Sequence, residues 1–336
     1  MDYSAIEKAL WEEGIYVDLA GLLDPTASIL GNGNDSLFKT VLTCFWEGIT
    51  GQKETFITLL VLCIVFGLIS QLVEALEQKE FKEYGYFIYF VCSASVCISL
   101  FMECFQIVEN LLESVVRYMQ VLIPVYSMGV LLTSGKQTAA GYYGMILGAI
   151  FLVELILSAV CLPCTKLFMA VQLANAGTGE MMLSKLCQLI YDCMNWGLKI
   201  LVTLLCGLQL VRALILSPLG ELTEHGVYKT MMMIPGVGQM TGDCLEMLLG
   251  SFKVMKNSIG AAGLIGLFLL MLTPCTVLLG YLLAARLLEA VMQPVVKETM
   301  LTMIGGCGQG IELLLKVALY TFLLLFVSLA ILTTLS

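Results

Sequence analysis

Histidine, charge and basic clusters are scarce in this chain, and each shortage excludes a class of function. The single histidine, His225, lies in the polar stretch "ELTEHG", so a histidine-based metal site or a serine–histidine–aspartate triad cannot be built. Only 13% of the 336 residues are charged, and no basic cluster is large enough to hold nucleic acid. We therefore expect no enzyme, no metal, no cofactor and no nucleic-acid partner.

Two motifs that superficially resemble ligand sites lack essential parts. Cys161 and Cys164 form a C-x-x-C, but no second pair accompanies them and apolar residues surround them, which argues against a metal. Most of the 13 cysteines lie in similar apolar runs and are expected to be free thiols. The stretch "GGCGQG" at Gly305–Gly310 lacks the strand and the Lys-Ser/Thr of a phosphate loop, so we reject nucleotide binding.

What the chain has in excess is apolar residues. They make up 59% of the sequence, whereas a soluble domain carries about 45–50%. Since one globular core cannot absorb this excess, the bilayer is its natural solvent. The sequence predicts an all-α, polytopic helical membrane protein with about 7–8 transmembrane helices.

The N-terminal region differs from the rest in charge. Residues 1–54 hold nine acidic and three basic residues, which is two thirds of the net charge of −9. Two amphipathic helices are expected there, either lying on the membrane or forming a small cap packed on the protein. No cleavable leader is visible, so we expect insertion through the first span or a leader missing from this sequence. Residues 55–117 then contain two spans, Phe56–Val73 and Gly85–Met102, and an interfacial or bundle-surface helix at 103–117.

A pattern at one fixed spacing predicts an internal duplication. Ile123-Pro124 recurs as Ile234-Pro235, and Pro163-Cys164-Thr165 recurs as Pro274-Cys275-Thr276, both 111 residues later. Two matching proline contexts at one offset favour a repeated unit. We divide the membrane part into residues 118–228 and 229–336. Each copy would hold a Pro-broken segment, a Gly-rich span, a stretch that starts at the Pro-Cys-Thr turn (164–178 in the first copy) and a last span.

The broken segments are the expected centre of function. Pro124 and Pro235 each remove a backbone donor, and Gly236 and Gly238 allow positive φ. Irregular backbone survives in hydrocarbon only where it is buried or lines water. We therefore predict two re-entrant or discontinuous helices around a common cavity, with surface loops as the alternative. If each copy crosses three times, the second copy is inverted; if 164–178 does not cross, the copies are parallel.

Charged residues within apolar runs mark a candidate polar path. Glu154 has apolar neighbours for about ten positions on either side, where a charge costs roughly 2.5–3.5 kcal/mol. Asp192 and Lys199 are its candidate companions, and a structural hydrogen-bonding role for Glu154 is the alternative. Small residues let helices approach closely in lipid, so glycines at regular spacing predict helix packing rather than a pore lining. They are Gly144, Gly148, Gly260, Gly263 and Gly266.

From about Ser217 onward the sequence resembles a known family. Ile234-Pro235 with Gly238, the stretch Lys256–Gly260 with Gly263, and Gln293-Pro294 occur in an order similar to that of the stage III sporulation protein AE family of endospore-forming bacteria. The resemblance implies a multi-pass protein of the mother-cell membrane around the forespore. It further implies a channel-like complex with other stage III sporulation membrane proteins and a forespore membrane partner, which sustains late forespore gene expression.

Two functional readings remain open at this point. In the first, the chain is a transport-type subunit, with the broken helices and Glu154 forming a path. In the second, it is a non-conducting membrane scaffold that assembles the other subunits. Since the sequence contains no energy-coupling motif, any driving force would come from a partner ATPase or a gradient.

Overall fold

The described part of the chain is entirely helical. The computed structural model describes residues 79–134, 148, 151–153, 155–177, 182–216, 258–293 and 298–335, together with single positions between residues 7 and 72. The elements in chain order are α6 (Lys79–Ser134), the short π-helix η1 (Leu157–Cys161), α8 (Leu162–Gly177), α9 (Ser184–Leu216), α12 (Ser258–Met292) and α13 (Glu298–Leu335). Within these ranges no strand occurs, which agrees with the all-α prediction.

Five of the described helices are long and apolar enough to cross a membrane. The shortest has 24 residues, and about 20 suffice for about 30 Å of hydrocarbon. They are Phe90–Pro124, Phe151–Gly177, Ser184–Gly207, Ala262–Met292 and Leu301–Ala330. The predicted membrane class is thus supported. The expected span at Phe56–Val73 lies outside the described residues except at single positions, so the predicted total of about 7–8 stays a prediction.

Helix α6 corrects the predicted boundaries in the first half. The expected span 85–102, surface helix 103–117 and broken segment 118–135 form one continuous helix of 56 residues. Pro124 lies inside it and does not end it. A proline frees the carbonyl one turn earlier, here that of Gln120, and both side chains are exposed on the same outward face. The predicted break at Pro124 is therefore not found, because buried Leu122 and Ile123 keep the turn packed on the bundle.

The Pro-Cys-Thr segments also lie within helices rather than at turns. Pro274 is inside α12, and Pro163 is the second residue of α8, directly after η1. A single π-helical turn is a recognised distortion of the backbone hydrogen bonds of an α-helix, and here the π-helical turn η1 comes just before Pro163. Both threonines donate to the carbonyl three residues earlier at 2.8 Å, Thr165 to Leu162 and Thr276 to Thr273. The two segments share this local geometry 111 residues apart, although the helices continue through them.

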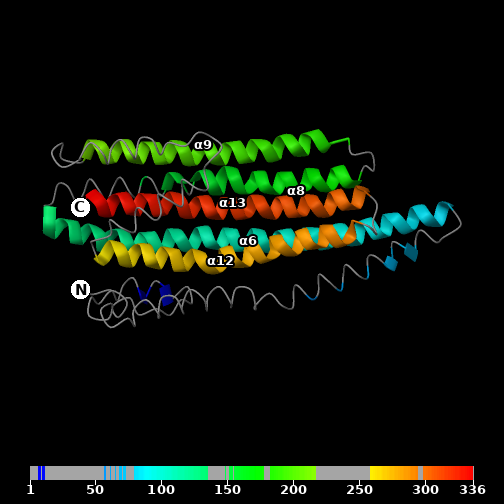
Figure 1. The fold of residues 1–336 in the computed structure, drawn as a ribbon, viewed down its shortest axis with the longest axis horizontal. Helices are drawn as coiled ribbons and strands as arrows, with labels where there is room; N and C mark the ends of the chain where they lie inside the picture. Colours follow the sequence, from blue (N-terminus) through cyan, green and yellow to red (C-terminus); the bar gives the residue numbers. More distant parts are fainter. Residues whose placement is uncertain are drawn as a thin grey trace.

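The five helices lie side by side in a long bundle (Figure 1). Helix α6 runs in the same direction as α13, since Cys97 lies against Cys307 and Phe101 lies against Gly310. Helix α12 runs the opposite way, from the C-terminal end of α6 back toward Glu103. The N-terminal end of α6 projects beyond the other helices.

The helix pairs α8–α9 and α12–α13 have the same directions: α8 runs parallel to α12, and α9 runs parallel to α13. Both α8 and α12 are antiparallel to α13, and α9 is parallel to it. The contacts that show this are Gln172–Thr302 and Met169–Gly310 for α8, Arg286–Glu312 and Phe268–Phe322 for α12, and Tyr191–Glu312 and Asn195–Lys316 for α9. The helices α8 and α9 of the first predicted copy thus run in the same directions as α12 and α13 of the second, and the orientation of whole copies stays a prediction. A duplication of the sequence itself stays a prediction.

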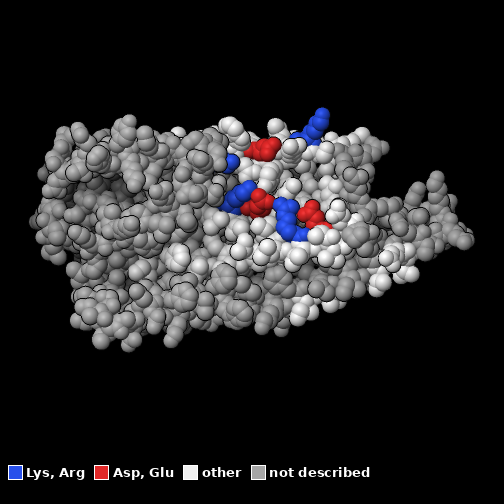
Figure 2. Space-filling model, in the orientation of Figure 1, with Lys and Arg blue, Asp and Glu red and all other residues white. Residues whose placement is uncertain are grey.

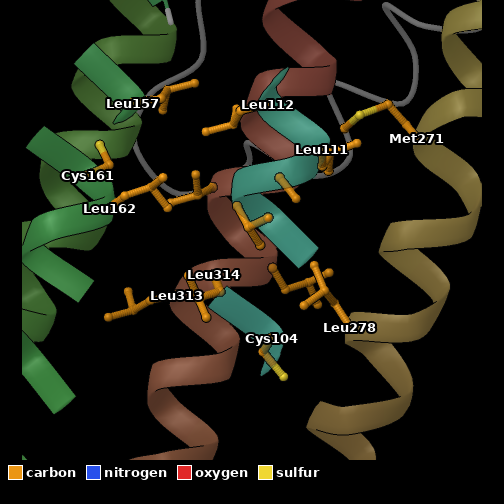
Figure 3. Close-up of a cluster of buried hydrophobic side chains, with 14 of the residues drawn as sticks. Cys104, Leu111, Leu112, Leu157, Cys161, Leu162, Met271, Leu278, Leu313 and Leu314 are labelled. Atoms are coloured by element: carbon orange, nitrogen blue, oxygen red, sulfur yellow. The ribbon is translucent and has the colours of Figure 1, made fainter. Parts of the chain in front are cut away.

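Helix α13 is the centre of the bundle and contacts each of the other four long helices. Figure 3 shows its Leu313 and Leu314 between α8 on one side and α6 and α12 on the other. Leu314 is fully buried, as is Leu278 of α12. The core is built from such buried apolar side chains, which come from all five long helices.

Glycines bring α13 close to its neighbours. A Cβ on Gly306 would overlap the side chain of Gln172, and one on Gly305 would stand 2.7 Å from Glu289 Oε1. A Cβ on Gly310 would lie 3.2 Å from the Phe101 ring. The sequence "GGCGQG" is therefore a helix surface on which α6, α8 and α12 pack, consistent with the rejection of a phosphate loop. Small residues allow this approach in lipid, where apolar burial between helices gives little driving force.

The predicted packing glycines have different surroundings. A Cβ on Gly263 would come within 2.8 Å of Leu122, and one on Gly266 would overlap the Tyr118 hydroxyl, so both lie in the α6–α12 contact. Leu10 also packs against Gly266 and is fully buried, while the rest of the predicted N-terminal region lies outside the described residues except for three neighbouring positions. Gly148 has no atom within 4 Å of a built Cβ. Gly260 lies in α12, and Gly144 lies outside the described residues.

Candidate functional site: polar surfaces of the bundle

Helix α6 is amphipathic along its second half. Its inward side chains between residues 101 and 122 are buried, and Tyr118 and Met119 are among the largest fully buried groups of the chain. The outward side is different. Each side chain that is exposed between residues 103 and 120 is polar or charged. These residues, called the α6 polar face below, are Glu103, Gln106, Glu109, Asn110, Glu113, Arg117 and Gln120.

Two hydrogen bonds locate the α6 polar face relative to α12. The Tyr118 hydroxyl donates to the Gly263 carbonyl at 2.9 Å, and the Tyr281 hydroxyl donates to Glu103 Oε1 at 2.5 Å. Between these bonds α12 runs from Gly263 to Tyr281 without a charged residue. The α6 polar face thus lies beside one of the most apolar parts of the chain, at the same depth of the bundle.

Many exposed side chains of η1, α8 and α9 are apolar, with Lys166 of α8 and Asp192 of α9 as exposed charged positions among them. Figure 3 places Leu157 and Cys161 beside α8 at the depth of Leu112 of α6. Next to them Leu155 and Val160 point outward, with 51% and 54% of their surface exposed. On α9 the exposed side chains include Trp196, Ile200 and Leu204. These surfaces suit lipid.

Acyl chains cannot hydrogen-bond the amides and carboxylates of the α6 polar face. Charged residues within spans almost always face a bundle interior or a water-filled cavity for this reason. The side chains of the face are exposed, although Glu103 accepts a hydrogen bond from Tyr281 and Arg117 donates one to Ser114. At membrane depth such a face is satisfied by water or by polar groups of protein.

A second polar feature, the ion-pair cluster, joins α9, α12 and α13. It comprises Tyr191, Asn195, Arg286, Glu289, Glu312 and Lys316. Figure 2 shows basic and acidic side chains gathered together midway along this face of the molecule. Three long helices are thus linked by charged hydrogen bonds, and Tyr191 of α9 is 121 residues from Glu312 of α13 in the sequence.

Glu312 is at the centre of the ion-pair cluster. Its Oε1 accepts from Lys316 Nζ at 2.7 Å and from the Tyr191 hydroxyl at 2.8 Å, and its Oε2 accepts from Arg286 at 2.8 Å. Lys316 also donates to Asn195 Oδ1 at 2.8 Å. Hydrogen bonds to ionised groups are about twice as strong as neutral ones. The carboxylate is therefore held by three donors from three helices.

Most charges of the ion-pair cluster offset one another locally. Arg286 also pairs with Glu289 at 3.2 Å, so two cations face two carboxylates. The side chains are 25–42% exposed, which places the cluster at the edge of the bundle rather than in its core. A paired group of this kind suits a structural link between helices. The charged groups of the ion-pair cluster are paired with one another, whereas the α6 polar face has a row of exposed polar side chains.

The predicted polar path coincides only partly with these features. Asp192 and Lys199 lie on α9, as do Tyr191 and Asn195, but neither forms an ion pair with a described residue. Asp192 is exposed, and Lys199 is half-buried with its carbonyl accepting from Thr203 at 2.9 Å. Glu154, Pro235, Gly236 and Gly238 lie outside the described residues.

Sequence reasoning missed the ion-pair cluster, although a signal was present. Glu312 and Lys316 are four residues apart, and Arg286 and Glu289 are three apart, which is the spacing of facing pairs on one helix. Such pairs in apolar helices are candidates for contact with each other. No described group of three His, Cys, Asp or Glu side chains could hold a metal. The ten cysteines whose state is described are free.

Comparison with known proteins decides the family. The profile of the family described as Stage III sporulation protein AE matches residues 31–336. The chain belongs to this family. The curated Stage III sporulation protein AE of Bacillus subtilis (strain 168) is 18% identical over 281 residues, which cover 83% of this chain and 70% of that protein. No solved structure matches the chain. Membership of the stage III sporulation protein AE family indicates a role in sporulation, and the five apolar helices are consistent with a membrane protein.

Proposed function

We propose that this member of the stage III sporulation protein AE family is a membrane subunit of a channel-like complex between mother cell and forespore, and that the α6 polar face borders a water-filled path in that complex. One observation carries the proposal. Every exposed side chain of α6 from Glu103 to Gln120 is polar, beside an uncharged stretch of α12. Water is the simplest environment that satisfies such a face at membrane depth.

The cellular part of the proposal rests on the family. The chain would be a multi-pass protein of the mother-cell membrane around the forespore and would support late forespore gene expression. Its partners would be other stage III sporulation membrane proteins and a forespore membrane protein, with a partner ATPase or a gradient supplying energy. The chain itself would act without catalysis.

The alternative function is a non-conducting scaffold. The ion-pair cluster and the glycine contacts of α13 hold five helices together and give the scaffold reading its physical basis. In that case the α6 polar face would be covered by a helix of another subunit, and no water would reach it. The two functions therefore differ in the accessibility of one face.

Thiol labelling separates these functions. Single cysteines at Gln106, Asn110 and Glu113 are introduced into a variant whose own cysteines have been replaced and which still sporulates. A charged, membrane-impermeant thiol reagent is applied to sporulating cells, with Ile200→Cys and Leu204→Cys on the apolar side of α9 as matched controls. Labelling at the α6 positions without labelling of the controls is expected. Equal protection at all five positions contradicts the water-filled path.

A further inference from the structure

Three distortions of the helix gather where η1 meets α8. The Leu162 N–H donates to the Leu157 carbonyl, as in a π-helix. Pro163 follows directly and has no N–H to donate. The Thr165 hydroxyl then donates to the Leu162 carbonyl at 2.8 Å. Prolines, π-helical turns and threonines bonded to the preceding turn are the features at which helices bend.

The same Pro-Cys-Thr segment in α12 provides a comparison within the chain. Helix α12 is α-helical throughout, so Pro274 has no π-helical turn beside it. Figure 3 shows Leu162 of α8 at a depth between Met271 and Leu278 of α12. Leu162 is next to Pro163, and Pro274 lies between Met271 and Leu278 in the sequence. The two prolines therefore lie at a similar depth, with α13 between their helices.

Helix α12 is fixed on both sides of its proline. Before Pro274, the Gly263 carbonyl accepts from the Tyr118 hydroxyl of α6 at 2.9 Å. After Pro274, the Tyr281 hydroxyl donates to Glu103 Oε1 of α6 at 2.5 Å. Because α6 is one continuous helix, these two bonds set the direction of both halves of α12. Bending at Pro274 would break one of them.

Helix α8 is held differently on the two sides of Pro163. After the proline, Gln172 Nε2 donates to the Thr302 carbonyl of α13 at 3.1 Å. Before the proline, side chains such as Val153 and Leu157 are buried in the apolar core. Apolar burial is non-directional, so it permits a helix segment to tilt where a hydrogen bond would fix its position.

We infer that η1 and Pro163 form a hinge. Residues 151–161, called the hinged segment below, swing at this hinge relative to residues 164–177, which stay on α13, while α12 stays straight at Pro274. Threonine hydroxyls and π-helical turns re-pair backbone groups near prolines in membrane helices, so the bend is compatible with lipid. The inference goes beyond the proposed function and does not depend on the water-filled path.

The hinged segment covers part of the buried side of α6. In Figure 3, Leu157 and Leu112 point toward each other from the two helices, and both side chains are buried. A swing of the hinged segment uncovers Leu112, while the contact between α6 and α12 stays closed. Hinges of this kind let one element move on an otherwise rigid framework. The bundle thus has one moving element among fixed helices.

Amide hydrogen exchange of the purified protein in lipid nanodiscs tests the hinge. Exchange in the hinged segment is expected to be at least about tenfold faster than in residues 264–272 of α12, because local opening there breaks fewer directional contacts. Pro163→Ala should slow exchange in the hinged segment, since a regular α-helix can then form across position 163. Pro274→Ala is the matched control and should leave exchange in the hinged segment unchanged. Equal exchange of the two segments in the parent chain, or no slowing by Pro163→Ala, overturns the inference.

The bond that holds α12 straight has a test of its own. Tyr118→Phe removes the hydrogen bond before Pro274 and should speed exchange in residues 264–272 toward the rate of the hinged segment. Exchange in the hinged segment itself should stay the same. Equal acceleration of both segments would show general destabilisation and contradict a specific hold on α12.

A disulfide lock tests whether sporulation needs the movement. Leu112→Cys and Leu157→Cys are combined in the variant without its own cysteines, and copper phenanthroline joins them in sporulating cells. The locked protein is expected to lose late forespore reporter expression, and a reductant should restore it. Phe268→Cys with Phe322→Cys is the control lock, because these rings are 6.1 Å apart and join α12 to α13 before Pro274. Expression that persists with the first lock closed, or falls equally with the control lock, overturns a function of the hinge.

These results are separate from the thiol labelling of the α6 polar face. A hinge without labelling of α6 leaves a scaffold with one moving helix segment, and the water-filled path is wrong. Labelling of α6 without a hinge leaves the path in a rigid subunit, and the hinge is wrong.

Discussion

The hydroxyl of Tyr118 donates a 2.9 Å hydrogen bond to the carbonyl oxygen of Gly263, and this bond joins α6 to α12. Tyr118 is almost fully buried, while its neighbour Arg117 on the same helix is exposed. The boundary between the packed and the polar side of α6 thus runs between adjacent residues. The bond holds the helix in the rotation that turns its polar face outward.

Loss of this bond should weaken the contact between α6 and α12. Tyr118→Phe removes one buried hydrogen bond and is expected to lower stability by about 0.5–1.5 kcal/mol. Thermal unfolding of the purified protein in detergent measures the change. Tyr84→Phe is the control, because Tyr84 is 69% exposed and a change there should have little effect. Equal shifts for the two variants contradict a specific role of the Tyr118 bond.

Gly306 should not tolerate even one methyl group. Gly306→Ala overlaps Gln172, so the contact between α13 and α8 must open at a cost of about 1–3 kcal/mol. Gly308→Ala is the matched control two residues away, where the nearest atom would lie at an ordinary 3.7 Å from the new Cβ. The melting temperature of each variant is compared with that of the parent chain. A Gly306→Ala variant as stable as Gly308→Ala would show that Gln172 moves freely.

The ion-pair cluster should behave as one coupled unit. Glu312→Gln leaves Lys316 and Arg286 without their shared carboxylate, and Lys316→Met removes the cation that faces it. The double variant is expected to lose less stability than the two single losses added together, with a coupling energy of about 0.5–3 kcal/mol. The free energy of unfolding in detergent is measured for the parent protein, the two single variants and the double variant. Strict additivity would mean that the contacts contribute nothing to stability.

Polarity of α6 should matter for sporulation more than for stability. The triple variant Gln106→Leu, Asn110→Leu, Glu113→Leu keeps the buried side of α6 unchanged and should therefore insert and fold. Late forespore reporter expression is expected to fall to the level of a strain without the protein. Gln188→Leu, at an exposed polar position on α9, is the comparison and should leave expression unchanged. Normal expression in the triple variant rules out a function for the polar face.

Glu154 offers a separate test of the predicted path. Glu154→Gln keeps the shape of the side chain and removes its charge, so a variant that assembles normally but fails in late forespore expression would support a conducting role. Reporter expression and co-purification with partner subunits are the two measurements. If Glu154→Gln and Pro235→Ala both leave sporulation normal, a path through these residues is wrong.

The amino-acid sequence alone determined the class of the molecule. An apolar content of 59% and long runs without charge indicate a protein that lies in the lipid bilayer. Within the bilayer, a chain can span only as helices or as a closed barrel. Family membership could also be inferred from the order of short motifs after Ser217, and the family profile that matches residues 31–336 confirms it. These properties depend on composition and order, which require no knowledge of contacts.

Only the tertiary structure decided where the helices end and which polar residues meet. Pro124 and Pro274 suggest breaks when local propensity is considered, but neighbouring helices can stabilise a turn that has lost one backbone bond. Glu312 and Arg286 are 26 residues apart, and no periodicity in the sequence specifies their 2.8 Å contact. The sequence predicted an interfacial or bundle-surface helix at 103–117, but only the structure shows that α12 and α13 pack against α6. Packing between distant segments sets these features, because each helix buries whichever face its neighbours can cover.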